Sequence, residues 1–344
     1  MRIAVISGTA YPASPDFYGS EVMLAVLADA LGKMGNEVTL YAASKSMKGS
    51  YRLRLLPCTW GMLSYVVESC VDVYMDEIME HDYIIDGSGL TMVCENIWFW
   101  HRDWLKEHAI VYYRNGYSSF NPRPPVNYNI HGVWLSKLAV SSMEPFKLPP
   151  EVTHVIPYGV PDWYKPVSEP TMDYWLYLGR PHPHKGVDIV LDLAKELPNE
   201  RFVFAWNAIF EEHKRYEEKY LQEIDRLPNC EFIKVRNLRR KVELLANAKA
   251  LIVPLGKDYV EAYGLVGHEA LACGTPIIYG ARSGIWEVAE EGKHGFKVES
   301  KEDVIKAMKS IDSISREACL EFARNNGPEL MAKRFLELYE EVRK

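Results

Sequence analysis

The sequence predicts an α/β protein built from two Rossmann-like domains that face each other across a cleft. Short β-branched runs alternate with amphipathic helical segments along both halves of the chain, a pattern typical of parallel sheets with crossover helices. The pattern is interrupted at residues 161–173, "PDWYKPVSEPTMD", which carry three prolines and no periodicity. The length of 344 residues also suits two domains that each bury a core.

The first half begins with a strand, a helix and a second strand. Residues 2–7 are a β-branched run of strand length, and residues 20–35 carry apolar side chains at helical spacing up to Gly35. Residues 37–43 return as a strand, which predicts a right-handed parallel crossover unit. Four further segments are expected to hold strands: 82–89, 109–116, 137–142 and 154–160.

The second half repeats this alternation. Strands are expected at 174–179, 201–206, 230–235 and 250–255, with helices at 187–197 and 238–248. The last stretch, 327–344, reads as an amphipathic helix with Leu330, Phe335, Leu338 and Val342 available for packing. The predicted organisation is therefore a first domain over 1–162, a linker over 163–173, a second domain over 174–326 and a C-terminal helix over 327–344 that can pack back on the first domain.

Composition narrows the classes of function. A formal charge of −7 argues against broad attraction to nucleic acid, so an anionic ligand must be held by a local cluster of donors. Six scattered cysteines without CxxC spacing are typical of reduced thiols in a cytoplasmic protein. The sequence contains no run of about 18 apolar residues, so no transmembrane helix is expected. A peripheral membrane contact stays open, and the oligomeric state is not predicted.

The segment "EAYGLVGHEALACGTP" (261–276) points to a ligand-binding helix start. A helix beginning near Gly264 would present the amides of Gly264, Leu265 and Val266 with the positive end of its dipole, and that geometry suits a diphosphate. The neighbouring Tyr263 is included in the predicted donor-binding set.

Two glutamates flank this helix start. Glu269, about one turn into the helix, can accept two hydrogen bonds from a vicinal diol such as a ribose. Glu261, in the preceding loop, can contact a second polyol such as a sugar ring. Simple dipole stabilisation explains either carboxylate but not the small residues between them.

The loop "LGRPHPHKG" (178–186) carries Arg180 and Lys185, and both side chains suit phosphate oxygens. An ordinary solvated basic loop is the alternative. The loop 178–186 follows a predicted strand in the same domain as the helix that begins near Gly264. This position favours ligand binding, because ligands bind at the carboxyl ends of parallel strands. His182 and His184 receive no role.

The loop before the first helix lacks the G-x-G-x-x-G spacing of a dinucleotide site, so NAD and FAD are disfavoured. Gly19 and Ser20 are nevertheless expected to present amides to a phosphate or sugar. "HEALAC" has Ala272 where a zinc protease needs its second histidine, and no Asp-x-Asp pair follows a strand. We therefore expect no metal and no cofactor beyond the donor substrate.

Four segments in this order resemble the retaining glycosyltransferases of family 4, which have the GT-B fold with an E-x7-E signature. They are "VIPYGVPDWYKP", "YLGRPHPHKGVD", "EAYGLVGHEALACGTPII" and "SGIWEVAEEGKHGFKV". The resemblance covers most of the chain and is strongest from about residue 155 onward. It implies transfer of a sugar from a nucleotide-diphosphate donor to an acceptor hydroxyl. It also implies that Arg180 and Lys185 neutralise the diphosphate, that Glu269 binds the ribose and that Glu261 touches the donor sugar.

The first half departs from the family pattern. The family often has Gly-Gly where this chain has Gly19-Ser20, and often has a histidine where Arg114 and Asn115 stand. Asp86, Arg114 and Asn115 are the expected acceptor or sugar contacts. Two alternatives remain: a nucleotide-sugar epimerase of the same fold, and a non-catalytic nucleotide-sugar binding protein. The sequence names neither the donor nor the acceptor.

Overall fold

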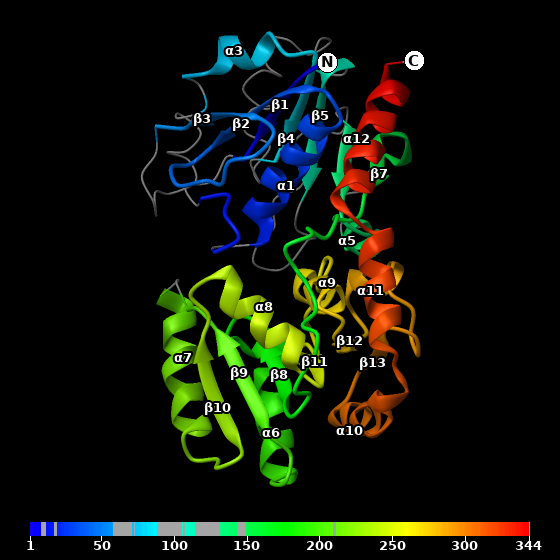
Figure 1. Ribbon diagram of the computed structural model, residues 1–344. Coiled ribbons are helices and arrows are strands. Elements are labelled where there is room, and N and C mark those ends of the chain that lie inside the picture. The colour runs from blue at the N-terminus through cyan, green and yellow to red at the C-terminus, as the bar shows by residue number, and fades with distance from the viewer. Residues whose placement is uncertain are drawn as a thin grey trace. The chain divides into compact units, whose positions relative to one another are not determined.

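The computed structural model describes most of the chain as two compact units. One comprises Met1–Pro161 together with Asn326–Lys344, and the other comprises Asp162–Asn325. We call them the first and the second unit and describe each by itself (Figure 1). The residues that the structure describes are 1–7, 12–16, 19–57, 71, 73–87, 105, 107–113, 131–142, 149–208 and 211–343.

In the described part of the first unit, seven parallel strands form one sheet in the order β3-β2-β1-β4-β5-β6-β7. The order reverses at β1, which lies between β2 and β4. The strands are β1 (Arg2–Ile6), β2 (Glu37–Ala42), β3 (Arg52–Leu55), β4 (Tyr83–Asp86), β5 (Ala109–Tyr113), β6 (His131–Trp134) and β7 (Thr153–Val155).

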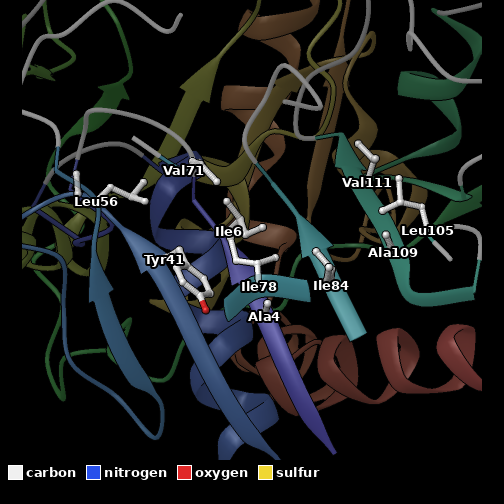
Figure 2. Packing of buried hydrophobic residues seen from close by; sticks show 11 residues of the cluster. Ala4, Ile6, Tyr41, Leu56, Val71, Ile78, Ile84, Leu105, Ala109 and Val111 are labelled. Carbon is white, nitrogen blue, oxygen red and sulfur yellow. The ribbon is translucent and has the colours of Figure 1, made fainter. Parts of the chain in front are cut away.

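Besides the C-terminal helix, the described helices of the first unit are α1 (Gly19–Lys33), α3 (Met75–Met79), α5 (Lys137–Ser141) and a short 3-10 turn, η2 (Pro150–Val152). Figure 2 shows one core cluster, in which side chains of β1, β2 and β4 such as Ile6, Tyr41 and Ile84 pack with Ile78 of α3. The continuous apolar character of these strands fits a parallel sheet covered on both faces.

The C-terminal helix α12 (Pro328–Val342) belongs to the first unit, where it contacts α1. The Tyr83 hydroxyl donates to the carbonyl of Phe335 at 3.3 Å, and the rings of Tyr83 and Tyr339 lie 4.5 Å apart. The buried side chains of α12 are Met331, Ala332, Phe335, Leu338 and Tyr339, whereas Leu330 and Val342 are only half-buried. Of the four side chains predicted to pack, Phe335 and Leu338 are thus buried and the other two are partly covered.

The prediction of a strand over 137–142 was wrong, because residues 137–141 form α5 and Ser142 is its C-cap. Ser136 caps this helix by accepting a hydrogen bond from the Ala139 amide at 2.9 Å. The hydroxyls of Ser141 and Ser142 donate back to carbonyls three residues earlier, which supports the last turn. The strand lies just before it, as β6.

In the second unit, six parallel strands form a sheet in the order β10-β9-β8-β11-β12-β13. The strands are β8 (Trp175–Leu178), β9 (Phe202–Trp206), β10 (Cys230–Lys234), β11 (Ala250–Val253), β12 (Ile277–Gly280) and β13 (Gly295–Val298). The helices are α6 (Val187–Glu196), α7 (Glu211–Ile224), α8 (Leu238–Asn247), α9 (Leu265–Ala272), α10 (Lys301–Ser310) and α11 (Arg316–Asn325), with short 3-10 turns η3 (Pro183–Lys185), η4 (Gly284–Glu287) and η5 (Ile311–Ser313).

The strand order of the second unit reverses between β8 and β11, which are neighbours in the sheet. In open α/β sheets, ligands bind at the carboxyl ends of the strands at such a reversal. The loops that leave β8 and β11 therefore occupy the position where a ligand site is expected.

Among the residues that the structure describes, no helix has the length and apolar character that a membrane-spanning segment needs. Of the six cysteines, Cys230, Cys273 and Cys319 lie in described regions and are free thiols. Burial raises the pKa of Cys273 and of Cys319 to about 12, so both thiols stay protonated near neutral pH.

Candidate active site

Two loops build the candidate site at the carboxyl ends of β8 and β11. The Gly256 amide donates to the His184 carbonyl at 2.8 Å, which ties one loop to the other. Gly186 has φ +75°, and a Cβ there would lie 2.7 Å from a carbon of Pro254. Only glycine permits this backbone conformation and this approach, so the sequence "HKG" is what allows the two loops to pack.

Lys185 and Glu261, one from each loop, form an ion pair whose side chains are largely buried, with 13% and 16% exposed. The ammonium also lies 4.9 Å from the ring centre of Tyr259. The backbone of Glu261 is held by two hydrogen bonds, its amide donating to Arg282 at 2.9 Å and its carbonyl accepting from Gly284 at 3.0 Å. A cation and a carboxylate are thus fixed where the two loops meet.

The helix start that the sequence predicts is present. Gly264 precedes α9 with φ +85°, and a Cβ there would lie 2.8 Å from the Ser283 hydroxyl. Leu265 and Val266 are the first two residues of α9, so no carbonyl of an earlier helical turn accepts from their amides. An N-terminus of this kind attracts anions through its amides and its dipole.

Tyr263 and His268 pack against each other beneath this helix start. Their rings are stacked, 4.2 Å apart at 21°, and both residues are buried. The structure therefore places the Tyr263 ring in the core. Burial lowers the pKa of His268 to about 3, so its imidazole is neutral near pH 7.

Glu269 lies one turn into α9 and is 5% exposed. The Tyr164 hydroxyl donates to its Oε1 at 2.6 Å, and Lys241 Nζ lies 2.6 Å from its Oε2. The second contact is an ion pair, because Lys241 approaches Oε2 off the direction of a good hydrogen bond. Lys241 also donates to the Tyr164 hydroxyl at 3.2 Å.

Sequence reasoning missed both partners of Glu269. Lys241 had a visible signal, because it stands three and four residues before Leu244 and Leu245, on the apolar face of α8. A lysine on an apolar face needs a buried counter-charge. Tyr164 falls in the predicted linker, and no periodic signal marked it.

Arg180 follows β8 and its residue is exposed. Its carbonyl accepts a hydrogen bond from Tyr177 at 2.8 Å, which fixes the backbone at this point. Lys185 is thus largely buried and paired with a carboxylate, whereas Arg180 is an exposed residue at the end of the same strand.

The predicted residues of the first unit lie at the carboxyl ends of its own strands or outside the described residues. Gly19 and Ser20 begin α1, after β1. Asp86 is the last residue of β4 and is fully buried. Arg114 and Asn115 lie outside the described residues.

Within the described ranges, no group of three or more His, Cys, Asp or Glu side chains is placed to hold a metal ion. Side chains and a helix N-terminus supply positive charge at the candidate site. Arg180, Lys185 and the N-terminus of α9 all belong to the carboxyl ends of β8 and β11.

Comparison with known proteins finds a match over most of the second unit. Residues 165–326 match the sequence model of the family Glycosyl transferases group 1. An uncharacterized glycosyltransferase of Methanocaldococcus jannaschii is 25% identical over 167 residues, which cover 48% of this chain and 45% of that protein. The chain thus matches about half the length of this curated relative.

Solved structures resemble the chain over nearly its whole length. The sucrose-phosphate synthase of Thermosynechococcus elongatus has a TM-score of 0.78 at 16% identity and covers 99% of both chains. A glycosyltransferase involved in avilamycin A biosynthesis has a TM-score of 0.75 at 20% identity, covering 99% of this chain and 98% of its own. Anabaena HepE, solved with UDP-glucose, has a TM-score of 0.76 at 17% identity, covering 99% of this chain and all of its own. The chain has the GT-B fold.

Proposed function

We propose that this chain is a retaining glycosyltransferase of family 4 that moves a sugar from a nucleotide-diphosphate donor to an acceptor hydroxyl. The observation that carries the proposal is the convergence of Lys185, Glu261 and the N-terminus of α9 where β8 and β11 end, inside the segment that matches the group 1 family model. This arrangement offers positive charge for a diphosphate and a carboxylate for a polyol at one place.

The donor in this proposal is a nucleotide-diphosphate sugar. Arg180, Lys185 and the amides at the start of α9 meet the phosphate oxygens, and Glu269 accepts from the ribose. Glu261 lies beside Lys185 and contacts the donor sugar. The UDP-glucose complex of Anabaena HepE supports a UDP-sugar as the first donor to test.

The proposed catalysis depends on stabilising the negative charge that develops on the leaving phosphate. As the sugar departs, negative charge builds on the β-phosphate oxygens, and fixed donors aimed at that charge are usually the largest catalytic contribution. The departing phosphate then helps to deprotonate the acceptor hydroxyl on the same face, so the anomeric configuration is retained. The acceptor in this proposal is a glycan, a lipid-linked sugar or a small molecule.

Charge neutralisation by Arg180, Lys185 and α9 makes the proposed reaction independent of metal ions. Saturating EDTA should therefore leave turnover unchanged. Loss of activity on EDTA, with recovery on Mn²⁺ or Mg²⁺, would contradict this part of the proposal. The free thiols and the nucleotide-sugar donor support a cytoplasmic location, with a peripheral membrane contact if the acceptor is lipid-linked.

The test is a panel of UDP-, GDP- and ADP-sugars labelled in the sugar. The proposal expects release of the nucleoside diphosphate from one class, slow without acceptor and fast with an acceptor extract. NMR of the product should show the anomeric configuration of the donor. An altered sugar still attached to the nucleotide would indicate an epimerase, and binding without turnover would indicate a non-catalytic protein.

A further inference from the structure

We infer that Lys241 and Tyr164 are positioning residues that hold Glu269 ready for a ribose, so that the chain selects ribonucleotide over deoxyribonucleotide donors. The inference rests on the proposed function, because it concerns the same nucleotide. It gives a role to two residues to which the sequence analysis assigned none: Tyr164, in the segment before β8, and Lys241, which lies outside the four family-like segments.

The carboxylate of Glu269 has hydrogen-bonding capacity that its two contacts do not use. A carboxylate has about four lone-pair sites, two on each oxygen. Tyr164 takes a site on Oε1, and Lys241 faces Oε2. Each oxygen therefore keeps lone-pair capacity for one hydroxyl donor, and Oε2 is buried without a hydrogen-bond partner. Two adjacent hydroxyls, such as the 2′- and 3′-hydroxyls of a ribose, match one unused lone pair on each oxygen.

The three side chains come from separate elements. Tyr164 lies in the segment before β8, Lys241 in the second turn of α8 and Glu269 in α9. Lys241 Nζ also lies 5.5 Å from the ring centre of Tyr164, which is a cation–π contact between the two residues that bind the carboxylate. Because each oxygen of Glu269 is contacted by one of them, the carboxylate loses little rotational freedom when it binds a ligand.

Packing alone does not explain Lys241. Its side chain is 21% exposed, on the same face of α8 as the buried Leu244 and Leu245, where an apolar residue would satisfy the core. Placing an ion pair there instead carries a desolvation penalty, and buried pairs of this kind often contribute little net stability. Lys241 is instead explained by its contact with the buried Glu269 carboxylate, which it pairs with and orients.

The test measures selectivity rather than affinity alone. Wild type, Lys241→Met and Tyr164→Phe are titrated by calorimetry with UDP, GDP or ADP, whichever wild type binds, and with its 2′-deoxy and 3′-deoxy counterparts. Lys195→Met is the matched control, because Lys195 is an ion-paired lysine on another helix of the same unit, with 46% of its side chain exposed. Thermal melts of each variant report folding.

For wild type we expect the ribonucleotide to bind roughly tenfold or more tightly than either deoxy form, since a hydrogen bond to a charged group is lost. Lys241→Met should reduce that ratio to below about threefold, Tyr164→Phe should reduce it partially, and Lys195→Met should leave it unchanged. Should Lys241→Met not fold, Lys241→Arg and Tyr164→Phe carry the test, because both preserve volume and change the contact.

The inference is overturned if folded Lys241 and Tyr164 variants keep the wild-type ratio. It is also overturned if wild type binds the ribonucleotide and its deoxy forms equally. That result would not contradict the proposed glycosyl transfer. Absence of binding of every nucleoside diphosphate to wild type would instead overturn the proposed function and this inference together.

Discussion

Lys185 and Glu261 lie 76 positions apart in the sequence and form an ion pair at the carboxyl ends of two neighbouring strands. In the proposed function, a donor diphosphate would compete with Glu261 for the ammonium of Lys185. The ion pair would then hold the lysine side chain in position before the phosphate binds.

Replacing Lys185 by alanine should lower kcat more than it raises KM. The phosphate oxygens gain negative charge as the sugar departs, so the ammonium acts most strongly in the transition state. Removal of one such donor typically lowers turnover by about 10² to 10³-fold. Steady-state kinetics check this, with Lys214→Ala as control because Lys214 pairs with the exposed Glu211 on α7. Near-native kcat in a folded Lys185→Ala variant would remove Lys185 from the mechanism.

Replacing Gly264 by alanine should destabilise the chain more than replacing Gly292. Both glycines have positive φ, +85° and +78°, which costs an alanine about 1 to 2 kcal/mol. A Cβ at Gly264 also meets the Ser283 hydroxyl at 2.8 Å, whereas Gly292 has open space around it. Denaturant melts should show a free energy of unfolding lower by roughly 1 kcal/mol in Gly264→Ala than in Gly292→Ala. Equal melts would show that the helix start tolerates the side chain.

The buried His268 should make stability fall as the solution is acidified. Burial lowers its pKa from 6.5 to about 3, so between these values the unfolded chain binds a proton that the folded chain does not. Its contribution is present above pH 6.5 and is lost as the pH falls towards 3. From pH 7.5 to pH 5 the loss from this group is about 2 kcal/mol.

Burial also lowers the pKa of His131, His154 and His294. The pH dependence of the wild-type free energy of unfolding therefore includes contributions from these three histidines. The measurement is therefore the difference between wild type and His268→Leu in chemical denaturation at pH 7.5 and at pH 5. His268→Leu should lose about 2 kcal/mol less stability than wild type over this interval. Parallel curves for the two proteins would show that the His268 imidazole reaches water.

The alternation of elements could be predicted from the sequence where segments were long and periodic. The unit β1-α1-β2, the strands from β8 to β11 and the helices α6 and α8 follow from apolar periodicity, with Gly35 marking the end of α1, whereas α7 was not predicted. The proximity of Lys185 to Glu261 could also be anticipated, because parallel strands end at the same edge of a sheet.

Other features depend on tertiary context. The run at 137–142 is too short for periodicity to separate helix from strand, and the capping contact of Ser136 decides it. Strand β6, "HGVW", carries no clear alternation. Tyr164 and Lys241 converge on Glu269 from 105 and 28 positions away along the sequence, and only the packing of α8 on α9 brings Lys241 there.

The central claim, that the second unit holds a nucleoside diphosphate through Lys185, the start of α9 and Glu269, is tested most directly by calorimetric titration. Wild type and Glu269→Gln are titrated with UDP, GDP and ADP, and melting curves establish that both are folded. We predict that at least one nucleotide binds wild type at one site per chain, and that Glu269→Gln weakens it by about 1 to 3 kcal/mol. Equal affinity in the two proteins, or no binding of any of the three nucleotides to wild type, would contradict the account.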